Sequence, residues 1–459
     1  MIRESLLPEG AGSTMSVPRC FPETDGSSVP APFASAGGAG RFAARAKNVD
    51  DADLMPPFQT QNDGMTVDAY GHGGFFTPAS IGPWVDIYLS AGVEDGGASC
   101  HHDNQATCGL YRVRWDLGLE RAVEVELIRR SWRGPDGTQY GNVEAAVSEA
   151  GDLAWLLRGY DPSGGDEKQT YLLHRRSGSS FADVLDSGTA KADRPHFPWF
   201  NTADTVIYAK HDGGPSPAGP DWQSLWWVPV GGAPHALVGR GPETELNSGA
   251  SDDLSYGNPQ AFGYDGRRVV TFGVEVGADG TVSEHTVPHV TSFFGTGRED
   301  FSLGGGGFLS CQHPAWSLDG TRIACTRHAK MEEPAIDRKL RQLYRFAKVG
   351  TIWVSEGPLF KAADPSLLPG PFPGVSCKLL TYKQAHWCGD ATHVVATVFC
   401  TDSNFPDLPP SMSRVLLINF KDQANPVHYD VTAAVVAAFR EMGGNRRWRA
   451  IFSVCRTVG

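Results

Sequence analysis

The sequence predicts an all-β fold, and three observations lead to that prediction. Glycine and proline are frequent, at 54 and 32 of the 459 residues, and both residue types mark turns. Short runs alternate between apolar and polar residues, which is the pattern of a half-buried strand; they lie at Trp84–Leu89, Leu110–Trp115 and Ala122–Ile128. A strand–turn–strand pattern then recurs along the chain, which indicates repeated sheets.

The composition bounds the class of protein. Hydrophobic residues make up 41% of the chain, which is enough to build a core. The net charge of −12 argues against a nucleic-acid-binding protein, because such a protein needs a basic face to displace counterions. No run of about 18 apolar residues is present, so no membrane span is expected.

The recurring pattern is clearest at Gln312–Cys325, where a tryptophan precedes an Asp-Gly turn and a strand rich in β-formers. Asp-Gly suits a tight hairpin turn because Gly tolerates a positive φ. The copies align on one apolar residue each, and these residues are Val147, Trp199, Phe262, Trp316 and Trp387. Their spacing of 52 to 71 residues is typical of a β-propeller, with one four-stranded antiparallel blade in each repeat.

The repeats predict the organisation of the chain. Residues 1–65 are expected to form a long irregular N-terminal arm, and residues 66–459 to form the propeller. Six blades are expected, with seven as the alternative; the six copies lie near 84–128, 142–186, 194–240, 257–300, 311–362 and 382–432. A C-terminal strand at 447–454 would pair with the first blade and close the ring.

Two inserted helices are also predicted. Glu332–Lys348 carries apolar residues at spacings of three and four, which is the pattern of an amphipathic helix. Val431–Met442 forms a second, short helical pattern before a pair of glycines.

The copy with the sequence His-Pro-x-Trp-Ser-x-Asp-Gly-x-Arg-Ile-Ala, at His313–Ala324, resembles the repeat of TolB-like (PD40, WD40-like) β-propellers. The resemblance extends over about residues 130 to 420 in five copies. The copies at Val147 and Trp199 lack the Asp-Gly turn, and the copy at Trp387 has Asp-Ala. The resemblance implies a propeller, and it leaves the number of blades open.

The repeat also nominates residues at one mouth of the central channel. The position three residues before each aligned apolar residue is Glu144, His196, Pro259, His313 and Gln384, with His386 close to the last. Imidazole together with a carboxylate or an amide oxygen can hold Mn²⁺, Ca²⁺ or Zn²⁺, and an imidazole alone can act as a general base. Histidines that only cap strand ends are the structural alternative.

The rim residues are also faintly similar to those of oligogalacturonate-lyase-type propeller polysaccharide lyases. That resemblance implies His313, Gln384 and His386 as metal ligands, His196 as the base and Arg194 as the group that holds the uronate carboxylate. It covers two blades. The histidine-rich motif after the glutamine is only partly present, because Gln384-Ala385-His386 supplies one histidine.

Two functions follow as expectations. The first is a binding or scaffold propeller that recognises a protein or a glycan through its channel-mouth loops, with Glu144, Trp199, His313 and Trp316 as binding residues. The alternative is a lyase that acts on uronate-containing glycans by β-elimination. A serine hydrolase is disfavoured because the chain has no Gly-x-Ser-x-Gly motif, and no pattern predicts the oligomeric state.

The nine cysteines and the N-terminus bear on the compartment. Cys100 and Cys108 could form a local disulfide, a second bridge could form among Cys377, Cys388 and Cys400, and most of the nine are expected as thiols. Met1–Gly10 has no apolar region of a signal peptide. Export is therefore not expected from this start, although a misassigned start or a removed leader would allow a periplasmic or extracellular location.

Overall fold

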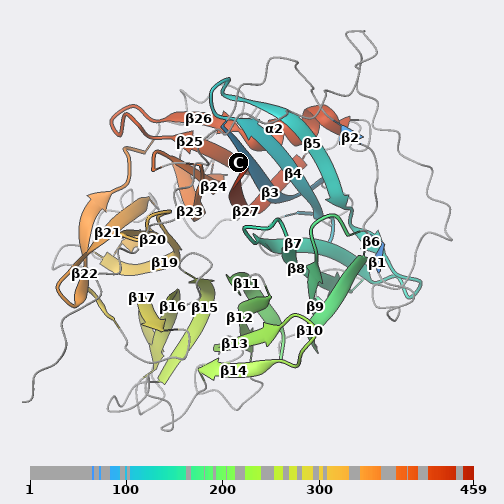
Figure 1. Ribbon diagram of the computed structural model, residues 1–459, viewed down its shortest axis with the longest axis horizontal. Helices are drawn as coiled ribbons and strands as arrows, with labels where there is room; N and C mark the ends of the chain where they lie inside the picture. The colour runs from blue at the N-terminus through green and yellow to red at the C-terminus, as the bar shows by residue number, and fades with distance from the viewer. Residues whose placement is uncertain are drawn as a thin grey trace, which may run out of the picture.

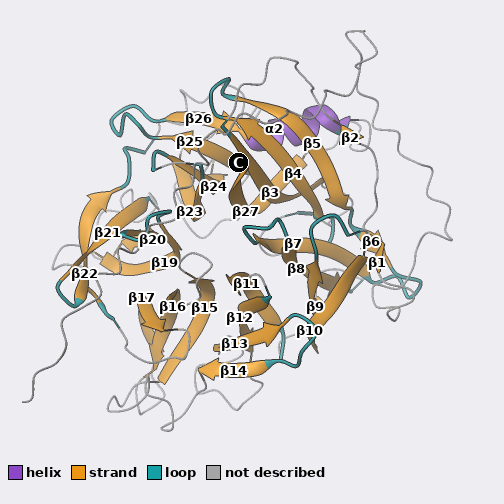
Figure 2. Ribbon diagram, viewed as in Figure 1, coloured by secondary structure: helices purple, strands orange, loops and turns teal. Residues whose placement is uncertain are grey.

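The computed structural model is a ring of antiparallel sheets (Figures 1 and 2), which confirms the all-β propeller expected from the repeats. No helix in the described part of the chain is long and apolar enough to cross a membrane. The structure describes residues 65–66, 72–73, 83–93, 99–100, 104–161, 167–179, 181–189, 193–202, 204–211, 223–238, 253–261, 268–276, 282–292, 299–302, 308–329, 342–362, 379–389, 391–401, 412–440 and 448–458. The expected irregular arm therefore lies almost entirely outside the described residues.

Three sheets come mainly from the first half of the chain. In hydrogen-bonded order, the first sheet contains β2 (His72–Gly73), β5 (Arg121–Arg129), β4 (Gly109–Asp116), β3 (Trp84–Val93) and β27 (Trp448–Val458). The second contains β1 (Met65–Thr66), β10 (Phe181–Thr189), β9 (Glu167–Arg175), β8 (Leu153–Tyr160), β7 (Gln139–Val147) and β6 (Trp132–Arg133). The third contains β11 (Pro195–Thr202), β12 (Thr205–His211), β13 (Gln223–Pro229) and β14 (His235–Val238).

Three further sheets follow around the ring. The fourth contains β15 (Asp253–Ala261), β16 (Arg268–Val276) and β17 (Val282–Ser292). The fifth contains β18 (Phe301–Ser302), β22 (Ile352–Pro358), β21 (Leu343–Val349), β20 (Arg322–Ala329) and β19 (Phe308–Trp316). The sixth contains β23 (Leu379–Trp387), β24 (His393–Thr401), β25 (Met412–Asn419) and β26 (Val427–Asp430).

The expectation of six four-stranded blades is wrong, and so is the alternative of seven. Among the described residues, five sheets have four strands or more, and the fourth sheet has three. The reason lies in the segment after β17. Glu299 pairs with Val290 of β17 only as an isolated bridge, and the strand that follows, β18, pairs in parallel with β22 of the fifth sheet. No fourth strand of the fourth sheet therefore forms among the described residues.

The strand nearest the axis differs in origin between the first sheet and the others. The inner strand of each sheet contacts the inner strands of both neighbouring sheets, in the order β7, β11, β15, β19, β23, β27 and back to β7. Figure 1 shows these strands around the axis of the ring. The inner strand of the first sheet is β27, from the C-terminus, which pairs antiparallel with β3. The two ends of the propeller therefore meet within one sheet.

The two helix predictions had different outcomes. The second is confirmed in shorter form as α2 (Val431–Ala438), which packs with the first and sixth sheets. The first is wrong over its described residues, because Leu343–Val349 is strand β21. Its pairing with β22 shifts between Arg345 and Phe346; such a bulge breaks the alternation of a strand and leaves apolar residues at a helix-like spacing.

Disulfides join three described pairs, Cys100–Cys108, Cys311–Cys325 and Cys388–Cys455. The expected bridge between Cys100 and Cys108 is confirmed. Cys388 pairs with Cys455 of β27 rather than with a neighbouring cysteine. Because Cys400 is also disulfide-bonded, all seven cysteines in the described ranges are bonded, and the expectation that most of the nine are thiols is wrong.

All six inner strands carry a β-bulge at an equivalent register. The pairing shifts after Val143, His196, Gly257, Gln312, Lys383 and Ile451. The next residue has a φ near +50° in five of the strands, and these residues are Glu144, Phe197, His313, Gln384 and Phe452. This left-handed conformation is uncommon outside glycine. Bulges re-aim side chains, and in this ring they do so at the channel wall.

Candidate functional site

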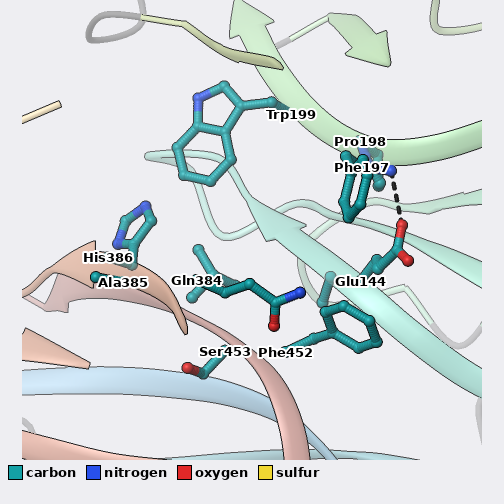
Figure 3. A pocket seen from close by; sticks show the side chains of 11 residues that line it. Glu144, Phe197, Pro198, Trp199, Gln384, Ala385, His386, Phe452 and Ser453 are labelled. Atoms are coloured by element: carbon teal, nitrogen blue, oxygen red, sulfur yellow. Dashed lines mark hydrogen bonds between the residues drawn. The ribbon is translucent and has the colours of Figure 1, made fainter. Parts of the chain in front are cut away.

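The bulges surround a cavity of about 50 Å³ on the axis of the ring (Figure 3). Four of the six inner strands, β7, β11, β23 and β27, supply its lining. The lining residues are Glu144, Ala145, Phe197, Pro198, Trp199, Gln384, Ala385, His386, Phe452, Ser453 and Val454. Since these strands come from four different sheets, the cavity exists only when the ring is closed.

One wall of the cavity carries an ion pair. Glu144 Oε1 accepts a hydrogen bond of 2.6 Å from Arg158 Nη2, and the two side chains are almost completely buried. The other carboxylate oxygen, Oε2, accepts a hydrogen bond of 2.7 Å from the backbone N–H of Phe197, which Figure 3 marks. The bulge of β11 thereby places a backbone donor on the carboxylate of the neighbouring sheet.

Arg158, on β8, holds three groups at once. Its Nη1 donates to Gln105 Oε1 at 2.8 Å, and its Nη2 donates to Glu144 and lies 2.6 Å from Nδ1 of His196. A guanidinium can only donate. Nδ1 of His196 is therefore the acceptor in this contact.

A second ion pair lies behind the first. Arg194 Nη1 donates to Glu167 Oε2 at 2.7 Å, and the hydroxyl of Thr170 also donates to Glu167. Burial raises the pKa of Glu167, but Arg158 and Arg194 together outweigh burial, so that the pKa lies below its usual value. Burial likewise works against the charge on Arg158, while the carboxylates of Glu144 and Glu167 raise its pKa above the usual value.

The opposite wall is formed by a tryptophan and a histidine. The ring centroids of Trp199 and His386 lie 4.8 Å apart with a tilt of 38°. His386 Nδ1 lies 3.0 Å from the carbonyl oxygen of Trp387 and 3.4 Å from the backbone nitrogen of Cys455. A carbonyl oxygen can only accept, so the shorter contact places the proton on Nδ1. Burial lowers the pKa of His386 to about 4, so the imidazole is neutral at pH 7 and Nε2 is an acceptor.

The structure brings together four of the residues nominated from the sequence, namely Glu144, Trp199, Gln384 and His386. Arg194 and His196 do not line the cavity and belong to the ion-pair network behind it. His313 does not line it either, although its ring lies 6.0 Å from that of Phe197.

Trp316 is a core residue. It is buried, lies edge-on to Trp353 at 5.5 Å, and is covered by the guanidinium of Arg268 at 4.8 Å. Across the described parts of the chain, no group of three or more His, Cys, Asp or Glu side chains is placed to hold a metal ion. The metal set of His313, Gln384 and His386 therefore stays a prediction.

Sequence reasoning missed Phe197, Phe452, Ser453 and Arg158. The alignment on Trp199 was one residue out of register, because the bulge of β11 places Phe197, and not His196, at the position of Glu144 and His313. Phe452 was missed because the C-terminal strand was not aligned with the repeats. The sequence signal that could have located Phe452 and Ser453 is the Phe-Ser pair itself, which stands at the bulge of the inner strand β27.

No protein-family model and no curated protein matches the chain. Similar solved structures include TolB from Acinetobacter baumannii, at 8% identity and a TM-score of 0.40, with 81% of this chain and 66% of TolB covered. They also include hydrazine synthase from Kuenenia stuttgartiensis, at 10% identity and a TM-score of 0.47, with 82% of this chain and 47% of the synthase chain covered. A thermostable family-43 glycoside hydrolase matches at 9% identity and a TM-score of 0.35, with 65% and 95% covered. The chain thus spans just under two-thirds of TolB and about half of the synthase chain, and we transfer no activity from these proteins.

Proposed function

We propose that this chain is a non-catalytic β-propeller that binds a ligand in the cavity on its axis. The observation that carries the proposal is the lining of the cavity. Three aromatic rings, of Phe197, Trp199 and Phe452, stand beside the polar groups of Gln384 and His386. Apolar walls with a few convergent polar groups are typical of small-ligand sites.

Binding is favoured over β-elimination because the groups that a lyase would use are already engaged. The Nδ1 lone pair of His196 accepts from Arg158, and Arg194 is paired with Glu167. A general base needs its lone pair within reach of the substrate proton, and a carboxylate clamp needs an unpaired cation. The lyase alternative stays a prediction and is tested in the same experiment.

The experiment compares the wild-type protein with two tryptophan variants on immobilised glycans and peptides. Trp199→Ala removes the aromatic wall of the cavity. Trp227→Ala removes a half-buried tryptophan that is also stacked on a histidine, His235, but stands on β13, the third strand from the axis. We expect Trp199→Ala to lose binding and Trp227→Ala to retain it. Equal loss in the two variants would contradict the proposal.

A second arm follows the ultraviolet absorbance of unsaturated products on uronate polysaccharides, with and without divalent metal. Growth of absorbance that His196→Ala abolishes would replace the binding proposal by the lyase.

We also infer that the sheets derive from one TolB-like repeating unit. The motif at His313–Ala324 supports this inference, as does the bulge at an equivalent register in every inner strand.

A further inference from the structure

We propose that the ligand of the axial cavity is the uncharged end of a neutral glycan. This inference rests on the proposed function and names its ligand class. It starts from polar atoms in the cavity lining that other described residues do not use.

Two groups in the lining have unused capacity. Gln384 Oε1 accepts a hydrogen bond of 3.4 Å from the Thr397 hydroxyl, whereas the amide N–H₂ makes none to another described residue. His386 donates through Nδ1 to the carbonyl of Trp387, which leaves Nε2 as an acceptor. The cavity therefore offers a donor, the amide of Gln384, and an acceptor, Nε2 of His386. Sugar hydroxyls also donate and accept, and they match such a mixed set.

The charge balance excludes an ionised ligand. The Glu144 carboxylate is neutralised by Arg158, and Glu167 is neutralised by Arg194. His386 is neutral at pH 7, because burial lowers the pKa of its imidazole to about 4. An ionised group that moves from water into the cavity without meeting a counter-charge loses hydration that nothing replaces. A uronate, a sialic acid, a phosphate or a peptide terminus would face that loss, whereas a neutral sugar would not.

The aromatic walls and the size of the cavity complete the assignment. Figure 3 shows the indole of Trp199 beside the imidazole of His386. The apolar face of a pyranose can pack on such a ring. A cavity of about 50 Å³ admits only part of one sugar ring, so the ligand enters by its end.

The test titrates the full-length protein with neutral gluco-, galacto- and manno-oligosaccharides and with oligogalacturonate of the same length, by calorimetry. We expect at least one neutral series to bind and oligogalacturonate to bind at least about tenfold more weakly, because a charge without a counter-ion is strongly disfavoured. Trp199→Ala should weaken binding about tenfold, while Trp227→Ala should leave it unchanged. EDTA should have no effect.

Preference for oligogalacturonate that Trp199→Ala abolishes would overturn the neutral ligand and leave the proposed function standing. Binding that Trp199→Ala leaves intact, or no binding to any glycan or peptide, would overturn the proposed function as well.

Discussion

Arg158 shows how one side chain can order a site without entering it. The guanidinium contacts Gln105 from the loop closed by Cys100–Cys108, Glu144 on the cavity wall and His196 on the next sheet. Each of these partners comes from a different segment of the chain. A buried charge with several partners specifies one arrangement of those segments, and its removal leaves the partners uncompensated.

Replacing Arg158 by Met should therefore destabilise the protein strongly. The variant leaves the Glu144 carboxylate buried without its cation, and we expect the free energy of unfolding to fall by about 3–5 kcal/mol. Urea denaturation measures the change. Arg322→Met is the matched control, because Arg322 is also paired with a glutamate, Glu356, but is 42% exposed, and exposed pairs contribute about 1 kcal/mol or less. Similar losses in the two variants would contradict the role given to burial.

The pKa of Asp430 predicts that this group lowers the stability of the fold as the pH rises. An ordinary carboxylate, whose pKa is lowered in the folded state, has the opposite effect. It caps α2 by accepting a hydrogen bond of 2.9 Å from the Ala433 N–H, and burial raises its pKa to about 6 despite Arg414 nearby. The folded state then binds the proton more tightly than the unfolded state, so stability from this group is present below about pH 4 and is lost as the pH rises through about 6.

Asp430→Asn should remove this loss, because Asn keeps the capping oxygen and carries no charge. We expect the variant to be more stable than wild type at about pH 7.5, by up to about 3 kcal/mol, and equal to it near pH 4. Thermal melts at the two pH values measure the difference. Asp422→Asn is the control with the opposite sign, since a hydrogen bond from Asn425 lowers the pKa of Asp422. A variant Asp430→Asn that is less stable at the higher pH would refute the assignment.

At the scale of elements, α2 packs over the junction between the first and sixth sheets. Val431, Val435, Ala438 and Phe439 are buried in one cluster with residues of β3, β4, β5 and β25. The helix therefore covers apolar surface that both sheets expose at the closure.

Val435→Ala should cost about 1–3 kcal/mol, because two buried methyl groups are lost and a small cavity remains. The neighbouring Val436 is only partly buried against the same cluster, so Val436→Ala should cost clearly less. Chemical denaturation of the two variants measures the difference. Equal effects would mean that α2 does not bury one face against the sheets.

The elements also show why local patterns predicted the fold better than the site. Asp-Gly turns and alternating residues are local signals, and they located the strands. The register of an inner strand is not local. The bulge before Trp199 moved Phe197 to the cavity, and the bulge at Arg345 and Phe346 made a strand resemble a helix. Trp316 matched the motif best and yet is a core residue, because a repeated tryptophan serves packing in its own sheet.

At the scale of the whole molecule, the strand that closes the ring also forms part of the cavity wall. β27 completes the first sheet by pairing with β3, and it contributes Phe452, Ser453 and Val454 to the cavity. One residue further on, Cys455 is bonded to Cys388, beside the strand that carries His386. A single covalent link therefore ties two walls of the cavity.

Removing the Cys388–Cys455 bond should open the ring at this point. The bond closes a segment with a sequence separation of 67 residues, against 8 for Cys100–Cys108. The entropy of loop closure grows with length, so the double variant Cys388→Ser/Cys455→Ser should lose about 4 kcal/mol and Cys100→Ser/Cys108→Ser roughly 2–3 kcal/mol. Hydrogen exchange should locate the difference. Protection should fall first in β27 and β3 of the variant that lacks Cys388 and Cys455, because these strands then depend on hydrogen bonds and α2 alone. Loss of protection spread evenly over all sheets would show that the closure is not the weakest point of the ring.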